Sequence, residues 1–341
     1  MMEKTISFVV PCYNSSAYMD ACITSLLGGE DVEIVIVDDG STKDNTAEKA
    51  DNWAKRFPDI VRVVHQENTG HGGAVMAGLR EARGKYFKVV DSDDWLNVHA
   101  RDLLLQQLRS FLQNKQEVDL VVTNYVYEHV ASGTQKIIRY RGALPTNQLI
   151  GWDDIGRFSI GQHILMHAVT FRTQLLRDSG LKLPHHTFYV DNIYVYHTLP
   201  HVQQLFYLPV DLYRYFIGRE DQSVNESVMV GRLDQQMRVT KLLISDYHVL
   251  DEIKEPKLAQ YMMHFLSLIV AASSSLANVS PYDDAAELKA QMWRDIHAHD
   301  EKMARKIARN PLVYGSNLKS KSGKRLAVFL YRVAQKLYRF N

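Results

Sequence analysis

The sequence has few cysteines and no excess of charge of one sign, and each shortage excludes a class of protein. Its 341 residues contain two cysteines, Cys12 and Cys22. Two cysteines cannot build the disulfide framework of small secreted domains, so we expect a reducing, cytoplasmic compartment. The 40 lysines and arginines balance 39 aspartates and glutamates. This balance argues against a nucleic-acid partner, which would require a strong basic excess.

Long hydrophobic runs and a glycine-rich fingerprint are also missing. No stretch reaches the roughly 18 apolar residues that span a bilayer, and Met1–Thr5 lacks the apolar region of a signal peptide. The short apolar run Leu266–Ala272 is predicted to fill the core of a helical domain. No glycine fingerprint follows the first predicted strand, which argues against a dinucleotide-binding oxidoreductase.

The N-terminal part of the sequence alternates between apolar strands and amphipathic helices. This order predicts an α/β domain with a Rossmann-like, mostly parallel mixed sheet and helices on both faces. After about residue 225 the pattern becomes helical throughout, so we predict one domain over residues 1–225 and a helical domain over 226–341. The strands are predicted at 6–10, 32–37, 61–65 and 86–90, and the helices at 16–27, 45–57, 74–82, 192–199, 232–250, 257–277 and 283–310.

Three carboxylates directly follow the fourth predicted strand, in Asp91-Ser92-Asp93-Asp94. Clustered carboxylates raise one another's pKa unless a cation or hydrogen-bond donors neutralise them. Oxygen ligands suit Mg²⁺ or Mn²⁺, which bind one or two carboxylates together with substrate phosphates. The alternative is a solvated turn that starts the next helix.

Four polar clusters, each at the carboxyl end of a predicted strand, converge on one crevice because ligands of such sheets bind there. They are Val-Pro-Cys-Tyr-Asn (10–14), Val-Asp-Asp-Gly-Ser (37–41), Glu-Asn-Thr-Gly (67–70) and Asp-Ser-Asp-Asp (91–94). As a set they resemble the ordered signature of family 2 glycosyltransferases with the GT-A fold. The resemblance implies an inverting transferase that moves a hexose or N-acetylhexosamine from a UDP-sugar to a saccharide or lipid-linked saccharide, with Mn²⁺ or Mg²⁺ as cofactor. It also implies a role in cell-envelope polysaccharide or glycolipid synthesis.

The resemblance further implies a nucleotide pocket made by the first three clusters. Tyr13 would stack on the base, with Pro11 and Asn14 lining the same pocket. Asp38 would accept a hydrogen bond from the uracil N–H, and Asn68 would contact the same base. The alternatives are a packed aromatic for Tyr13 and a turn residue for Asn68; Asp39 would cap the turn at Gly40 and Ser41.

In the acidic tetrad Asp91-Ser92-Asp93-Asp94, the resemblance assigns the metal to Asp93 and Asp91. Asp91 would approach the ribose or a metal-bound water, Ser92 would contact the nucleotide-sugar, and Asp94 would lie near the donor sugar or support the metal shell. Many relatives carry an arginine in the helix after the third cluster, where this chain has Ala74-Val75-Met76. Phosphate binding would then fall to His71 and to loop amides such as that of Gly70 at a helix N-terminus.

Two later segments complete the expected site. Arg219 follows a tyrosine-arginine strand that resembles the one closing over the diphosphate in relatives; the alternative is an exposed loop arginine. Asp191 matches the expected catalytic base, although Val190 replaces the usual acidic neighbour. The competing interpretation is that Asp191 caps the helix predicted at 192–199.

The last predicted helix, Lys324–Phe340, has a basic face and an apolar face. Such a helix can lie on an anionic membrane, here the inner face of the plasma membrane; the alternative is packing on the domain or on a second copy of the chain.

A zinc site at His163 and His167 is discounted, because no third ligand is marked by spacing. The remaining rivals are a non-catalytic nucleotide-sugar-binding scaffold and a sugar nucleotidyltransferase.

Overall fold

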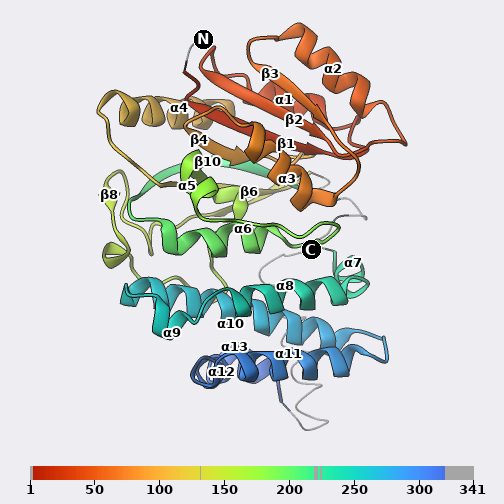
Figure 1. The fold of residues 1–341 in the computed structure, drawn as a ribbon, viewed down its shortest axis with the longest axis vertical. Coiled ribbons are helices and arrows are strands. Elements are labelled where there is room, and N and C mark those ends of the chain that lie inside the picture. The colour runs from red at the N-terminus through yellow and green to blue at the C-terminus, as the bar shows by residue number, and fades with distance from the viewer. Residues whose placement is uncertain (1–2, 131, 219–221, 223–224, 319–341) are drawn as a thin grey trace. The chain divides into compact units, whose positions relative to one another are not determined.

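The protein forms two compact units, Met1–Phe216 and Ile217–Asn341 (Figure 1). A computed structural model describes residues 3–130, 132–218, 222 and 225–318. The first unit is a mixed α/β structure and the second is helical, which confirms the predicted fold class. The domain boundary predicted at 225/226 falls within the second unit.

Among the described residues of the first unit, ten strands form one sheet in the order β3-β2-β1-β4-β9-β6-β10-β5, with β7 on β6 and β8 on β10. The strands β1 to β4 pair in parallel, and β9 joins β4 and β6 in antiparallel fashion. The strands are β1 (Ile6–Cys12), β2 (Val32–Asp38), β3 (Val61–His65), β4 (Tyr86–Val89), β5 (Trp95–Leu96), β6 (Leu120–His129), β7 (Thr134–Ile138), β8 (Leu149–Ile150), β9 (Val169–Arg172) and β10 (Leu205–Ile217).

The centre of the sheet is covered on both faces. Every residue of β1 and β2 is buried, which explains why these strands are continuous apolar runs rather than alternating ones. The strand β1 continues beyond its predicted end at Val10, although Pro11 cannot donate a hydrogen bond. Pro11 pairs in register with Val37, and the carbonyl of Cys12 accepts the N–H of Asp39 at 2.8 Å, so the pairing resumes after the proline.

The helices of the first unit connect these strands. They are α1 (Met19–Leu26), α2 (Thr46–Arg56), α3 (Gly70–Glu81), α4 (Val98–Gln113), α5 (Thr173–Asp178) and α6 (Asp191–Thr198), with 3₁₀ turns η1 (Trp152–Asp154), η2 (Met166–Ala168) and η3 (Leu199–His201). Helix α3 begins at Gly70, four residues before its predicted start. The reason is a cap from a distant residue, because the Asp39 carboxylate accepts the N–H groups of Thr69 (2.9 Å) and Gly70 (2.8 Å).

The second unit is organised around its longest helix, α10, and contains α7 (Glu226–Val230), α8 (Leu233–Asp246), α9 (Val249–Glu252), α10 (Pro256–Val279), α11 (Ala285–His299), α12 (Glu301–Ala308) and α13 (Pro311–Ser316). The helix predicted over 283–310 is broken at Asp300. Its carboxylate accepts the N–H groups of Lys302 (2.8 Å) and Met303 (3.0 Å), so Asp300 starts a new helix, α12.

Helix α10 is long and apolar enough to cross a membrane, but 67% of its most apolar 18 residues are buried within the protein. Leu266 and Val270 are fully buried, as is Phe265 beside them. The run Leu266–Ala272 therefore contributes to the core of a helical unit, as predicted.

Candidate active site

The acidic tetrad is fastened to β10 through Asp94. The hydroxyl of Tyr213 donates to Oδ2 of Asp94 at 2.6 Å, and the N–H of Phe216 donates to Oδ1 at 2.8 Å. The same hydroxyl accepts the N–H of Asp91 at 3.1 Å. Burial and the charges of Asp93 and Asp91 raise the pKa of Asp94 well above its usual range. A bound cation would oppose that shift by stabilising the ionised carboxylates.

Asp91 is paired with His71, which lies in the first turn of α3. Nε2 of His71 is 2.8 Å from Oδ1 of Asp91. Burial raises the pKa of Asp91, but the charge and hydrogen bond of His71 outweigh it and leave the pKa below its usual value. Burial lowers the pKa of His71, and Asp91 outweighs that effect so that the net shift is upward. Each residue therefore shifts its partner toward the charged form.

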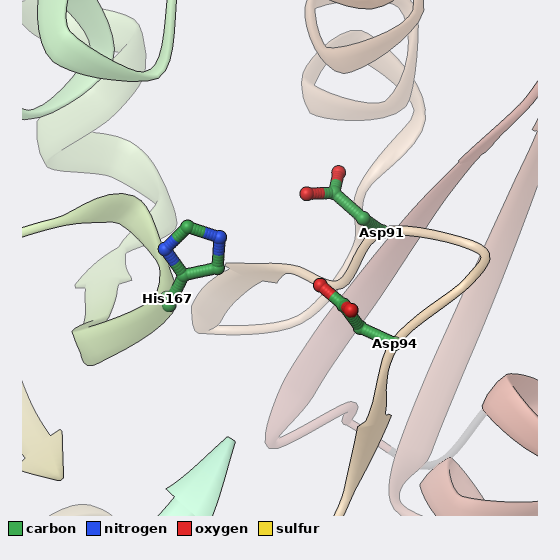
Figure 2. A group of neighbouring side chains, drawn as sticks. All are labelled: Asp91, Asp94 and His167. Atoms are coloured by element: carbon green, nitrogen blue, oxygen red, sulfur yellow. The ribbon is translucent and has the colours of Figure 1, made fainter. Parts of the chain in front are cut away.

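His167 joins two carboxylates of the tetrad from η2. Figure 2 shows that the side chains of Asp91, Asp94 and His167 face a common space, and one ligand atom of each lies within 4.8 Å of the others. Nδ1 of His167 is buried and has no hydrogen-bond partner among the described residues. Burial lowers the pKa of His167 to about 4, so the ring is neutral at pH 7. In Figure 2 the nitrogen of His167 that faces the carboxylates is Nε2, and two carboxylates with a neutral imidazole nitrogen fit a divalent cation such as Mn²⁺.

This group differs from the predicted ligand pair. It contains Asp91, but Asp93 is not a member and stays a prediction as a ligand. Asp94, expected near the donor sugar or in support of the metal shell, lies inside the group. Ser92 is half-buried between Asp91 and Asp93 in the same turn.

Asp191 is brought toward the tetrad by close packing at the start of α3. The N–H of His186 donates to the carbonyl of Thr69 at 2.9 Å. Gly70 has a φ of +80°, and a Cβ there would lie 2.8 Å from the nitrogen of His186. The chain then reaches Asp191 at the first position of α6, with Val190 at the N-cap position.

The environment of Asp191 favours a proton acceptor near neutral pH. Burial raises its pKa to about 6, with His71 lowering the pKa and Asp91 raising it. These interactions place the charge of Asp191 near the His71–Asp91 pair. A carboxyl with this pKa is ionised at pH 7 and is basic enough to accept a proton in a reaction.

The predicted nucleotide pocket lies at the ends of β1 and β2. Tyr13 is 49% exposed, so the alternative of a packed aromatic does not hold. Asn14 has a φ of +49°, and its Oδ1 accepts the N–H groups of Thr42 (3.1 Å) and Lys43 (3.0 Å). Pro11 lies in β1 just before them. An exposed aromatic ring beside a rigid turn is suited to stacking on a flat ligand.

The two aspartates of the second cluster are both buried but have different partners. Asp38 accepts the N–H of Ser41 (3.1 Å) and lies 2.9 Å from Nδ1 of His65. The sequence suggested that Asp39 caps the Gly40–Ser41 turn, but Asp39 caps α3 instead. The turn is closed by Asp38. Gly40, at φ +71°, lies against Asn68, whose nitrogen is 2.8 Å from the position of an added Cβ. The base contacts of Asp38 and Asn68 stay predictions, and Arg219 lies outside the described residues.

Comparison with known proteins identifies the family. Residues 7–176 match the family model described as glycosyl transferase family 2. The chain belongs to glycosyltransferase family 2. Glycosyltransferase GlyG of Streptococcus pneumoniae is 39% identical to this family 2 chain over 129 residues, which are 36% of the chain and 40% of that protein. The putative glycosyltransferase EpsH of Bacillus subtilis is 36% identical over 135 residues, or 39% of the chain and 37% of that protein. Each match thus spans less than half of the relative.

Solved structures share the GT-A fold of this family 2 chain over nearly its whole length. S. aureus TarS 1–349 has a TM-score of 0.69 at 18% identity, covering 97% of this chain and 92% of that one. The same protein in complex with UDP-GlcNAc has a TM-score of 0.64 at 18% identity, covering 98% and 91%. This likeness confirms the predicted fold.

Two parts of the family 2 site were missed by sequence reasoning. His167 was noted only for its spacing from His163, and Tyr213 only as part of a strand that resembles relatives. Their signals are weak in the sequence because His167 and Tyr213 meet the tetrad across more than 70 and 110 residues, respectively. A histidine two residues before an apolar strand is the one local hint for His167.

Proposed function

We propose that this protein is a metal-dependent, inverting glycosyltransferase that moves a hexose or N-acetylhexosamine from a UDP-sugar to a hydroxyl of a saccharide or lipid-linked saccharide. The observation that carries the proposal is the meeting of a candidate base, Asp191, with the Asp91–Asp94–His167 group at the end of a GT-A sheet. We place its role in cell-envelope polysaccharide or glycolipid synthesis, at the cytoplasmic face of a membrane.

Two structural neighbours support the choice of donor and metal. TarS is known in complex with UDP-GlcNAc. GalNAc-T7 is known with UDP, GalNAc and Mn²⁺, and it has a TM-score of 0.50 at 17% identity, covering 91% of this chain and 58% of that one. We therefore expect UDP as the nucleotide and Mn²⁺ or Mg²⁺ as the cofactor.

In this mechanism the chain binds the donor between its first and fourth strands. Tyr13 stacks on the uracil, which Asp38 and Asn68 contact from the next two loops. Asp91, Asp94 and His167, together with Asp93 by resemblance, would hold the cation. When bound, that cation compensates the negative charge of the diphosphate leaving group. His71, whose pKa is raised by Asp91, adds positive charge on the same side when it is protonated. The N–H of Gly70, expected to bind phosphate, donates to Asp39 instead.

Proton transfer falls to Asp191. The acceptor hydroxyl attacks the anomeric carbon from the face opposite UDP, and the Asp191 carboxylate takes its proton as the new C–O bond forms. The bond between the anomeric carbon and the diphosphate oxygen breaks, and UDP leaves with the electron pair. One displacement inverts the anomeric centre, so an α-linked donor gives a β-linked product and no glycosyl-enzyme forms.

The test is UDP release from UDP-glucose, UDP-galactose and their N-acetyl forms with Mn²⁺, followed by acceptor screening. Replacing Asp191 with Asn keeps the shape of the side chain but removes the proton acceptor, so we expect kcat to fall about 10²- to 10⁴-fold with UDP binding retained. Asp178→Asn, at an exposed site on α5, is the matched control and should match wild type.

The rivals give different results in the same assay. A binding scaffold would hold UDP-sugar without releasing UDP in the presence of any acceptor. A sugar nucleotidyltransferase would release pyrophosphate from UTP and a sugar 1-phosphate. Either result, or retention of the anomeric configuration, would contradict the proposal.

A further inference from the structure

Lys88, in the middle strand β4, occupies an unusual environment for a lysine. It is the one fully buried lysine among the described residues, with 0% exposure. Lysine is almost never fully buried unless it is paired, and removing an ammonium group from water costs several kcal/mol. No carboxylate lies within ion-pair distance of Lys88 in the described part of the chain. Burial lowers the pKa of Lys88 to about 7, and its amine keeps hydrogen-bond donors in either protonation state, so its role lies in what it contacts.

The contacts of Lys88 converge on the backbone that carries His167. Its Nζ donates to the carbonyl of His167 at 2.8 Å and to the carbonyl of Val169 at 3.1 Å. These carbonyls belong to the end of η2 and the start of β9. Two hydrogen bonds from one amine to alternate carbonyls fix the direction of the chain at this turn, and therefore the place from which the His167 ring projects.

Aromatic contacts connect the same lysine to the residue that holds Asp94. Nζ lies 5.4 Å from the centre of the Tyr213 ring, a distance at which a cation and an aromatic face attract each other. The His167 ring packs edge-on against Tyr213 (4.8 Å) and Tyr215 (4.7 Å). Lys88 therefore contacts the turn that carries His167 and also Tyr213, the tyrosine bound to Asp94. It does so from β4, the strand that leads into Asp91.

We propose that Lys88 is a positioning residue that holds His167 against Asp91 and Asp94, through its hydrogen bonds to the His167 and Val169 carbonyls, so that the three side chains bind one divalent cation. The inference rests on the proposed function, because it takes this group as the metal site. It adds a residue that does not itself touch cation or substrate.

The test is the affinity of the full-length protein for Mn²⁺, measured by electron paramagnetic resonance of free Mn²⁺ with and without UDP. Lys88→Met keeps the length of the side chain and removes its donors, so we expect Mn²⁺ to bind about 10- to 100-fold more weakly, the range for outer ligand-supporting contacts. Lys88→Gln keeps N–H donors and should bind Mn²⁺ more tightly than Lys88→Met. Thr170→Val is the matched control, because its buried hydroxyl in β9 has no partner among the described residues.

A second background separates positioning from general damage to the fold. If Lys88 acts through His167, Lys88→Met should add less than twofold to the loss caused by His167→Ala alone, because coupled residues are not additive. A full additional loss in that background would contradict the proposal, as would wild-type Mn²⁺ affinity in a folded Lys88→Met protein. If Lys88→Met does not fold, Lys88→Leu, which also removes the donors, supplies the same comparison in the two backgrounds. Wild-type protein that binds no Mn²⁺ with UDP would instead overturn the metal dependence in the proposed function.

Discussion

At the scale of single residues, the pKa of Asp191 makes the proposed base testable by pH. Burial raises this pKa to about 6, and only the ionised carboxylate accepts a proton. We therefore expect kcat/KM at constant Mn²⁺ to fall about tenfold per pH unit below pH 6 and to level off above it. The measurement is UDP release between pH 4.5 and 8. A profile that is flat down to pH 4.5 would show that Asp191 is not the base, or is not buried in the working enzyme.

The raised pKa of Asp191 also makes protein stability depend on pH. The dependence has the opposite sign from that of an ion-paired carboxylate, whose pKa is lowered. Because the folded-state pKa exceeds the ordinary value of 3.8, ionising Asp191 costs folding free energy, and stability contributed by the neutral form is lost as pH rises from about 4 to 6. The Asp191→Asn variant stays neutral, so its melting temperature relative to wild type should be higher at pH 7 than at pH 4. An equal difference at both pH values would contradict the raised pKa.

Residue identities in the site were predictable where a local motif carries them. The tetrad, His71 and Asp191 were all expected at the site from sequence, and the structure brings their charges close together. Lys88 and His167 were not expected, because a lysine inside an apolar run and a histidine before a strand acquire meaning only when β4 and β9 become neighbours. Local sequence does not determine that pairing.

At the scale of elements, the helices predicted from the sequence within the described residues are present, but α4 (Val98–Gln113) was not predicted, and the ends of the predicted helices differ in the structure. The start of α3 at Gly70 depends on Asp39, a cap supplied from another loop, and glycines have too little helical preference to mark that start. The break at Asp300 has a local cause, since aspartate is a good N-cap residue, but the continuous helical pattern around it hides the signal. Caps from distant residues and breaks inside periodic segments therefore shift the ends of the helices that were predicted.

The first turn of α3 offers a prediction at this scale. Gly70 combines a φ of +80° with backbone contact to His186, so Gly70→Ala should cost about 1–3 kcal/mol of stability and shift the segment that leads to Asp191. We expect kcat to fall more than the affinity for UDP. Melting temperature, UDP binding and UDP release of the variant measure these effects.

Gly180→Ala is the matched control for the backbone strain that alanine meets at a positive φ. Gly180 also has a positive φ, +73°, but nothing lies within 4 Å of its added Cβ. It should lose a comparable amount of conformational energy and keep kcat. Equal kcat values for the two variants would show that the contact between Gly70 and His186 does not position the base.

At the scale of the whole molecule, the parallel half of the sheet could be predicted and the antiparallel half could not. Strands β1 to β4 alternate with helices, and that rhythm has one simple topology. Strands β6, β9 and β10 pair across long separations, and β9 lies between β4 and β6, which no local pattern indicates. The helical unit was predictable as a class, because the apolar run in α10 is long enough to need burial.

Membrane association is predicted for Lys324–Phe340, which lies outside the described residues. The prediction rests on eleven lysines and arginines and no acidic residue between Lys302 and Asn341. Each basic residue near an anionic surface contributes about 1 kcal/mol, and salt screens this attraction beyond a Debye length of about 10 Å at 0.1 M. We therefore expect the full chain to float with phosphatidylserine-rich vesicles at low salt, and a chain ending at residue 320 to remain in the soluble fraction.

Salt and lipid charge distinguish this helix from α10 as the source of any binding. Binding through the basic helix should be lost at 0.5 M salt and on neutral phosphatidylcholine vesicles, because it depends on screened charges. Insertion of α10 would be insensitive to salt and would be shared by both chains, since both contain Pro256–Val279. Equal flotation of the two chains would therefore remove the basic helix as a membrane anchor, and flotation of neither would favour its packing on the domain or on a second copy.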